Sequence, residues 1–201
     1  MRSQPTIKEA TSPDAVRARG LIRLLMAIQP RCPEKIWLSG GTLRDILVGS
    51  GVSESSDVDL LFFNEKETSK NYEIDLQAEL VELTDIRNLS VKNQARMGLV
   101  VDGVKYENLL QSVAAFPDVT IAVAACVHDP NNQTTLVFAP YGLPSEDRAL
   151  IQPTSRYLAA HQLGDYYAWL DRKKYEQRLR NWTIDTAARE PLASSSAFMV
   201  C

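Results

Sequence analysis

The chain has 201 residues, of which 45% are hydrophobic, and its formal net charge is −3. This length and composition predict one domain with a hydrophobic core, and they exclude a chain that is disordered throughout. The net negative charge argues against extensive, sequence-independent binding to nucleic acid, which needs a concentrated excess of Lys and Arg.

The cysteines and the apolar runs indicate where the protein works. Cys32, Cys126 and Cys201 are widely spaced and form no paired metal-binding or redox motif. The N-terminal sequence lacks the apolar core of a secretory signal, and no run approaches the roughly 20 apolar residues of a membrane span. We therefore expect a cytoplasmic protein with no membrane partner.

The first predicted elements are a helix, a strand and a second helix. Ser12-Pro13-Asp14 is typical of a helix start, and Pro30 ends that helix. The apolar run Ile36–Leu38 then predicts a buried strand that leads into Gly40-Gly41 and a helix starting at Thr42. Glycines allow close approach of a ligand, and a helix start offers free amides to an anion. A phosphate cradle and a plain turn are both compatible with these glycines taken alone.

A second apolar strand, predicted over Asp57–Phe63, begins with two acids one residue apart. Residues two apart in a strand point to the same face, so Asp57 and Asp59 present a pair of oxygen ligands. Aspartate disfavours strands, and two at the head of so apolar a run favour a functional site. Such a pair suits Mg²⁺ (or Mn²⁺), which binds one or two carboxylates together with substrate phosphates.

The later elements alternate between helix and strand, which predicts an α+β fold with a mixed sheet flanked by helices. They are a helix over 65–84, a strand over 89–92, a turn at 102–103, a helix over 108–115 and a hairpin from 119–127 and 135–138. We expect a single domain over 1–182, with a helical C-terminal segment over about 143–182 whose aromatic side chains pack on the core. Residues 183–201 have little pattern and predict a flexible tail.

Three motifs together carry a resemblance to a known superfamily. Gly40-Gly41, Arg44-Asp45 and Asp57-Val58-Asp59 resemble the head of the nucleotidyltransferases related to DNA polymerase β, poly(A) polymerases and CCA-adding enzymes. Lys92–Met97, with the sequence KNQARM, narrows the resemblance to a small bacterial nucleotidyltransferase-like family. The similarity is strong over residues 37–97 and continues weakly to residue 182.

The resemblance implies a polymerase β-like fold, with Ser39, Gly40 and Gly41 positioning the phosphates of a nucleoside triphosphate. Asp57 and Asp59 are then the catalytic carboxylates that hold Mg²⁺ (or Mn²⁺), and metal ions activate a hydroxyl and neutralise charge on the phosphates. Further contacts with the nucleotide are expected from the polar side chains Arg44, Lys92, Asn93 and Arg96. For the face shared by residues 92, 94 and 96, a solvent-facing strand edge is the alternative.

A third carboxylate normally completes this kind of site, and the sequence departs from that pattern. Asn93 stands where the third acid is expected, and an amide is a poor base. Glu107 is the leading substitute if its segment lies beside the acidic strand, whereas Asp85 and Asp102 have the setting of loop acids.

The leading hypothesis is a metal-dependent nucleotidyltransferase that moves a nucleoside monophosphate from a nucleoside triphosphate onto an unidentified hydroxyl. One alternative is a tRNA nucleotidyltransferase-like head, although the long helical neck and body for tRNA are missing from the sequence. The other is a nucleotide-binding or interaction module whose catalysis is weakened or lost.

Overall fold

The computed structural model describes a large part of the chain. The described residues are 23–32, 35–48, 57–62, 64, 66, 69–84, 86–93, 100–101, 104–105, 109–129, 134–144, 150–174, 179, 181–192 and 197–200.

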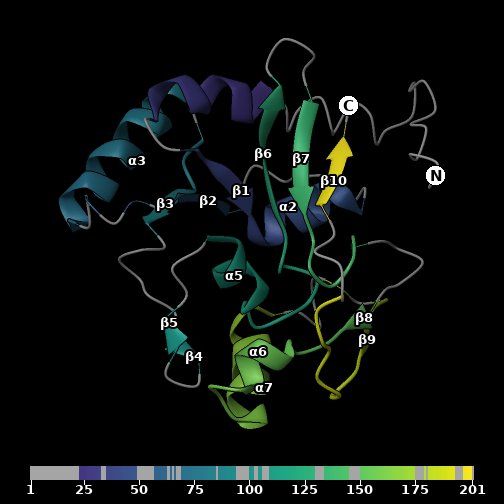
Figure 1. Ribbon diagram of the computed structural model, residues 1–201. Coiled ribbons are helices and arrows are strands. Elements are labelled where there is room, and N and C mark those ends of the chain that lie inside the picture. Colours follow the sequence, from purple (N-terminus) through teal and green to yellow (C-terminus); the bar gives the residue numbers. More distant parts are fainter. Residues whose placement is uncertain are drawn as a thin grey trace.

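The fold is built on a six-stranded sheet with the strand order β10-β7-β6-β1-β2-β3 (Figure 1). Its strands are β1 (Trp37–Ser39), β2 (Val58–Phe62), β3 (Leu89–Asn93), β6 (Ala124–Asp129), β7 (Thr134–Phe138) and β10 (Ala197–Val200). Strands β2 and β3 run parallel, and the other neighbouring pairs in this sheet are antiparallel. Because a parallel pair needs a crossover, the connection between β2 and β3 carries helix α3 (Lys70–Thr84).

One face of the sheet is covered by helices. Val58, Leu60 and Phe62 alternate along β2 and enter the largest hydrophobic cluster. The same cluster contains residues from α3, from helical residues 23–28, which lead into the short 3-10 helix η1 (Gln29–Arg31), and from α2 (Gly40–Leu47). This face is therefore the main core of the molecule.

The opposite face of the sheet carries a smaller apolar cluster and the polar site. Leu61, on the other side of β2, packs in a cluster with Val113 of α5 (Leu109–Ala114) and with Ala124 of β6. Asp59 is two residues from Leu61 in the same strand, so its side chain lies on this second face. Figure 1 shows α5 apart from α3, between the sheet and the C-terminal helices.

Beyond the sheet, the C-terminal helices form a cluster of their own. It is built from Ile151, Tyr166, Leu170 and Leu179, with Trp169 and Trp182 at its margin. The elements in this part of the molecule are β8 (Leu150–Ile151), α6 (Ser155–Leu158), α7 (Leu163–Arg172) and β9 (Thr183–Ile184). Strands β4 (Val100–Val101) and β5 (Val104–Lys105) form a separate two-stranded sheet. Tyr166, Trp169 and Trp182 of the predicted C-terminal segment thus pack together, whereas Tyr167 is exposed.

Two segments of the predicted flexible tail are strands. Thr183–Ile184 forms β9, which pairs with β8, and Ala197–Val200 forms β10, which pairs with β7. Strand β10 pairs with the edge of β7 through the backbone, which extends the sheet by one strand. The segment expected to be a flexible tail thus contains strands at 183–184 and 197–200, which its local pattern did not indicate.

The α+β fold with a mixed sheet is confirmed. Among the described helices, none combines the length and the apolar character needed to cross a membrane.

Candidate active site

The glycine turn between β1 and α2 brings the backbone against the acidic strand. Gly40 begins α2 with a φ of +79°, a conformation that side-chain-bearing residues rarely adopt. A Cβ atom on Gly40 would lie 3.0 Å from Oδ2 of Asp59. The glycine turn therefore lies against the Asp59 carboxylate, and a side chain at residue 40 would require a shift of that carboxylate or of the turn. The close approach of a ligand to these glycines stays a prediction.

Two hydroxyl groups fasten this turn to its surroundings. Ser39 is fully buried, and its Oγ donates a hydrogen bond of 2.6 Å to the carbonyl of Val123, just before β6. Thr42, in the first turn of α2, donates from Oγ1 to the carbonyl of Asp57. Ser39 makes no side-chain cap on α2, so its hydroxyl acts as a tie between segments.

The two predicted carboxylates lie at the head of β2 and differ in their exposure to solvent. Asp57 is exposed and precedes the strand, whereas Asp59 lies within it and is 31% exposed. Oδ1 of Asp59 accepts a hydrogen bond of 2.6 Å from Ser90 Oγ and one of 3.0 Å from Lys92 Nζ. One oxygen of Asp59 is thus held by β3, and the other faces the glycine turn.

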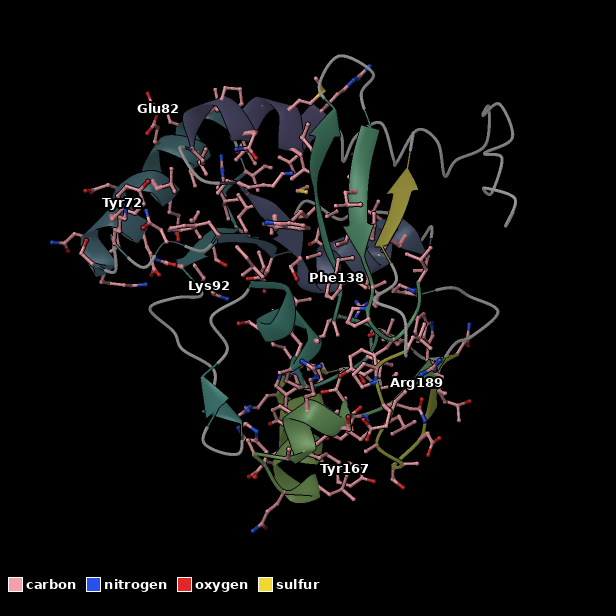
Figure 2. The ribbon with its side chains drawn as sticks, viewed as in Figure 1. Tyr72, Glu82, Lys92, Phe138, Tyr167 and Arg189 are labelled. Carbon is pink, nitrogen blue, oxygen red and sulfur yellow. The ribbon has the colours of Figure 1, made fainter. Side chains whose placement is uncertain are left out.

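The pairing of β2 with β3 explains these contacts. Asp59 stands opposite Ser90, and Lys92 lies two residues further along the same face of β3. Figure 2 shows Lys92 on the side of the sheet away from α3. The sequence pattern predicts a site role for Lys92 but not for Ser90. Because residues two apart in a strand share a face, the spacing between Ser90 and Lys92 could have identified Ser90.

Asn93 lies on the opposite face of β3. It shares that face with Leu89 and Val91, which belong to the main core, and it is itself buried. Its amide donates to the carbonyl of Asn64 at 2.7 Å and accepts from the Asn64 backbone N–H at 3.0 Å. Strand alternation thus places Asn93 on the face of β3 opposite to Ser90 and away from Asp59, and its predicted contact with the nucleotide stays a prediction.

Arg44 is also built into the interior. Its side chain is 1% exposed, and Nε and Nη2 donate to Oδ1 of Asp45 at 2.8 and 2.7 Å. The same Nη2 would lie 3.6 Å from a Cβ atom on Gly41. The guanidinium therefore lies beneath the glycine turn and supports it.

The carboxylate of Asp118 is buried and lies near Arg44. Asp118 accepts hydrogen bonds from the backbone N–H of Thr120 at 2.8 Å and from the hydroxyl of Tyr166 at 2.7 Å. Burial raises the pKa of Asp118 from 3.8 to about 6, against the lowering effects of its bonds to Thr120 and Tyr166 and of the nearby Arg44 charge. This group connects the region of α2 to α7.

The remaining candidates, Arg96 and Glu107, lie outside the described residues, as do Asp85 and Asp102. Within the described part of the chain, no group of three or more His, Cys, Asp or Glu side chains could hold a metal ion. Asp57 and Asp59 are the described carboxylates at the head of β2, and their oxygen atoms suit Mg²⁺ or Mn²⁺ when a substrate supplies further ligands.

Comparisons with known proteins identify the fold and the family. The chain resembles a solved structure described as a CCA-adding enzyme head domain, with a TM-score of 0.71 and 20% identity over 90% of this chain and 98% of that one. It also resembles a CCA-adding enzyme in its apo form, with a TM-score of 0.50 and 15% identity over 89% of this chain and 41% of that one. At these identities the likeness shows the fold alone.

No curated protein sequence matches the chain. A family model described as a nucleotidyltransferase, by contrast, matches residues 34–184, which include the glycine turn, both aspartates and the C-terminal helices. The resemblance expected from the motifs is thereby confirmed, and the chain belongs to this nucleotidyltransferase family, with a polymerase β-type fold.

Proposed function

We propose that the protein is a metal-dependent nucleotidyltransferase that moves a nucleoside monophosphate from a nucleoside triphosphate onto an unidentified hydroxyl. The observation that carries this proposal is the contact between the glycine turn and the acidic strand. Gly40 lies so close to Asp59 that a single methyl group would fill the gap, at 3.0 Å from Oδ2. Phosphates bound at the start of α2 would therefore lie beside the carboxylates.

The residues of the turn would bind and orient the triphosphate. The start of α2 offers backbone N–H groups and the positive end of the helix dipole to an anion. Gly40 and Gly41 keep side chains out of the way, while Ser39 and Arg44 hold the turn in place from the interior. Lys92 adds a positive charge on the same face as Asp59.

Asp57 and Asp59 would hold Mg²⁺ or Mn²⁺, and the fit rests on their oxygen donors and on the charge that they bring to the head of β2. When bound, the cation neutralises charge on the phosphates and favours ionisation of the attacking hydroxyl. Glu107 is the proposed third acid and Arg96 a further phosphate contact, both on the strength of the sequence.

Transfer of a labelled α-phosphate tests this proposal. The full chain is incubated with Mg²⁺, each α-labelled nucleoside triphosphate and a panel of hydroxyl acceptors, and pyrophosphate release is followed in parallel. We expect Asp57→Asn and Asp59→Asn to abolish both signals, because each removes a metal ligand. Asp75→Asn, which changes an exposed acid on α3, is the matched control and should keep them. A wild-type protein that releases no pyrophosphate with any acceptor would contradict the proposal.

A binding module without catalysis is the second candidate. It is favoured by the engagement of Asp59 with Ser90 and Lys92, and by the lack of a third acidic ligand among the described residues. Calorimetric binding of a nucleoside triphosphate without pyrophosphate release would support it.

A tRNA lacking its 3′ end belongs in the acceptor panel because of the fold similarity to a CCA-adding enzyme head domain.

A further inference from the structure

We propose that the ammonium group of Lys92 is a built-in cation of this site, so that Asp57 and Asp59 take up one divalent cation and not two. This inference rests on the proposed function, because it concerns the same carboxylates. It assigns Lys92 a role as a positioning residue that acts through Asp59.

The hydrogen bonds of Asp59 show that one of its two oxygens is already occupied by donors from β3. Oδ1 receives two donors from β3, the Ser90 hydroxyl at 2.6 Å and the Lys92 ammonium at 3.0 Å. Both donors are set by strand register, because Ser90 stands opposite Asp59 and Lys92 shares the face of Ser90. Of the two oxygens, Oδ2 is the one that approaches Gly40 and remains on the side of the predicted phosphate cradle.

The charges at the site favour a single divalent cation. The carboxylates of Asp57 and Asp59 carry −2, the ammonium of Lys92 reduces this to −1, and Glu107, the proposed third acid, would bring the total to −2. Phosphoryl-transfer sites with two divalent cations use carboxylates to balance four positive charges together with the substrate. The ammonium of Lys92 already contacts Oδ1 of Asp59, and a second divalent cation at that oxygen would be repelled by the Lys92 charge at close range.

The ion pair between Lys92 and Asp59 is partly exposed to solvent, so Lys92 is not needed to stabilise the fold. Lys92 is 41% exposed and Asp59 31% exposed, and ion pairs so open to solvent contribute little to folding stability. Replacing Lys92 should therefore leave the fold intact while changing the electric field at the carboxylates. Lys92→Met keeps most of the apolar stem of the side chain, and Lys92→Arg keeps the charge.

The test is a titration of the nucleotide-free full chain with Mn²⁺, in which electron paramagnetic resonance measures the free ion. Wild type and Lys92→Arg should each bind one Mn²⁺ at the Asp57 and Asp59 carboxylates. Lys92→Met should bind Mn²⁺ about tenfold more tightly, or should gain a second ion, because a positive charge close to the ligands is gone. Lys173→Met, which removes an exposed lysine after α7, should behave as wild type.

A double variant tests whether Lys92 changes Mn²⁺ binding through Asp59. In Asp59→Asn, the substitution Lys92→Met should no longer change Mn²⁺ binding, because the carboxylate through which Lys92 acts is absent. The inference is overturned if Lys92→Met binds Mn²⁺ as wild type does, or if wild type already binds two ions at this site. Lys92→Gln repeats the test if the methionine variant does not fold.

The outcome separates this inference from the proposed function. Mn²⁺ binding is measured without nucleotide or turnover, so a protein with no transferase activity still reports the effect of Lys92. A tighter Lys92→Met variant of an inactive protein would support the charge argument and contradict the enzyme. An active wild type whose Mn²⁺ affinity is unchanged by Lys92→Met would support the proposed function and contradict the charge argument.

Discussion

Oδ2 of Asp59 lies 3.0 Å from the position that a Cβ atom on Gly40 would occupy. Gly40 also has a φ of +79°, so two independent features require glycine at this position. The glycine turn and the acidic strand therefore fit closely against each other.

Gly40→Ala should lower the free energy of unfolding by about 1–2 kcal/mol, because alanine is strained at positive φ. It should also weaken Mn²⁺ binding, since the new methyl group displaces the Asp59 carboxylate. Urea denaturation and the Mn²⁺ titration measure the two effects. Gly41→Ala is the matched control: its Cβ would meet Nη2 of Arg44 at 3.6 Å, an ordinary contact. Equal losses in the two variants would contradict this account of Gly40.

Asn93→Ala should destabilise the protein and leave metal binding unchanged. The substitution removes two hydrogen bonds between the buried amide and the backbone of Asn64, for a loss of about 1–3 kcal/mol. Ser90→Ala, on the other face of β3, should change Mn²⁺ affinity with a smaller cost in stability. Urea denaturation and Mn²⁺ titration compare the variants. If Asn93→Ala weakened Mn²⁺ binding as Asp59→Asn does, Asn93 would belong to the site after all.

The contrast between Asp59 and Asn93 shows what local sequence can predict. The glycine turn, the acidic strand and the helix after it depend on neighbouring residues, and their pattern is sufficient to identify them. The face of Asn93 depends on strand parity: Leu89 and Val91 are apolar, so residue 93 follows them into the core. The same alternation, applied to the amino-acid sequence of β3, separates Asn93 from Lys92.

Other features have no local signal. Strand β10 forms because the edge of β7, some 60 residues earlier in the chain, is available to pair with it. The hydrogen bond between Tyr166 and Asp118 joins residues 48 positions apart. A tyrosine in an aromatic helix and an aspartate after a proline each predict ordinary local structure. Only the tertiary packing brings the two together in the interior.

Tyr166→Phe should reduce the free energy of unfolding by about 1.5–3 kcal/mol, because it removes a donor from a buried carboxyl group. The loss should appear as a lower urea midpoint with little change in the slope of the transition. Tyr167→Phe provides the control, since Tyr167 is exposed on the same helix (Figure 2) and its hydroxyl should matter by less than about 0.5 kcal/mol. Comparable losses in both variants would show that the Asp118 contact contributes little.

The raised pKa of Asp118 predicts how stability depends on pH. The carboxyl has a pKa of about 6 in the folded protein against an ordinary value of 3.8, with burial as the main cause. Between these values the folded protein binds more protons at Asp118 than the unfolded chain does. Its contribution to stability is therefore complete below pH 3.8 and is lost as pH rises toward about 6.

Asp118→Asn removes this titration while keeping the shape of the side chain. The free energy of unfolding of wild type, minus that of Asp118→Asn, should fall by about 2 kcal/mol as pH rises from about 4 to 7, because most of a shift of about two pKa units is expressed in that range. Urea denaturation at several pH values gives the difference, from which the titration of all other groups cancels. A difference for Asp118→Asn that stays level over this pH range would contradict the raised pKa of Asp118.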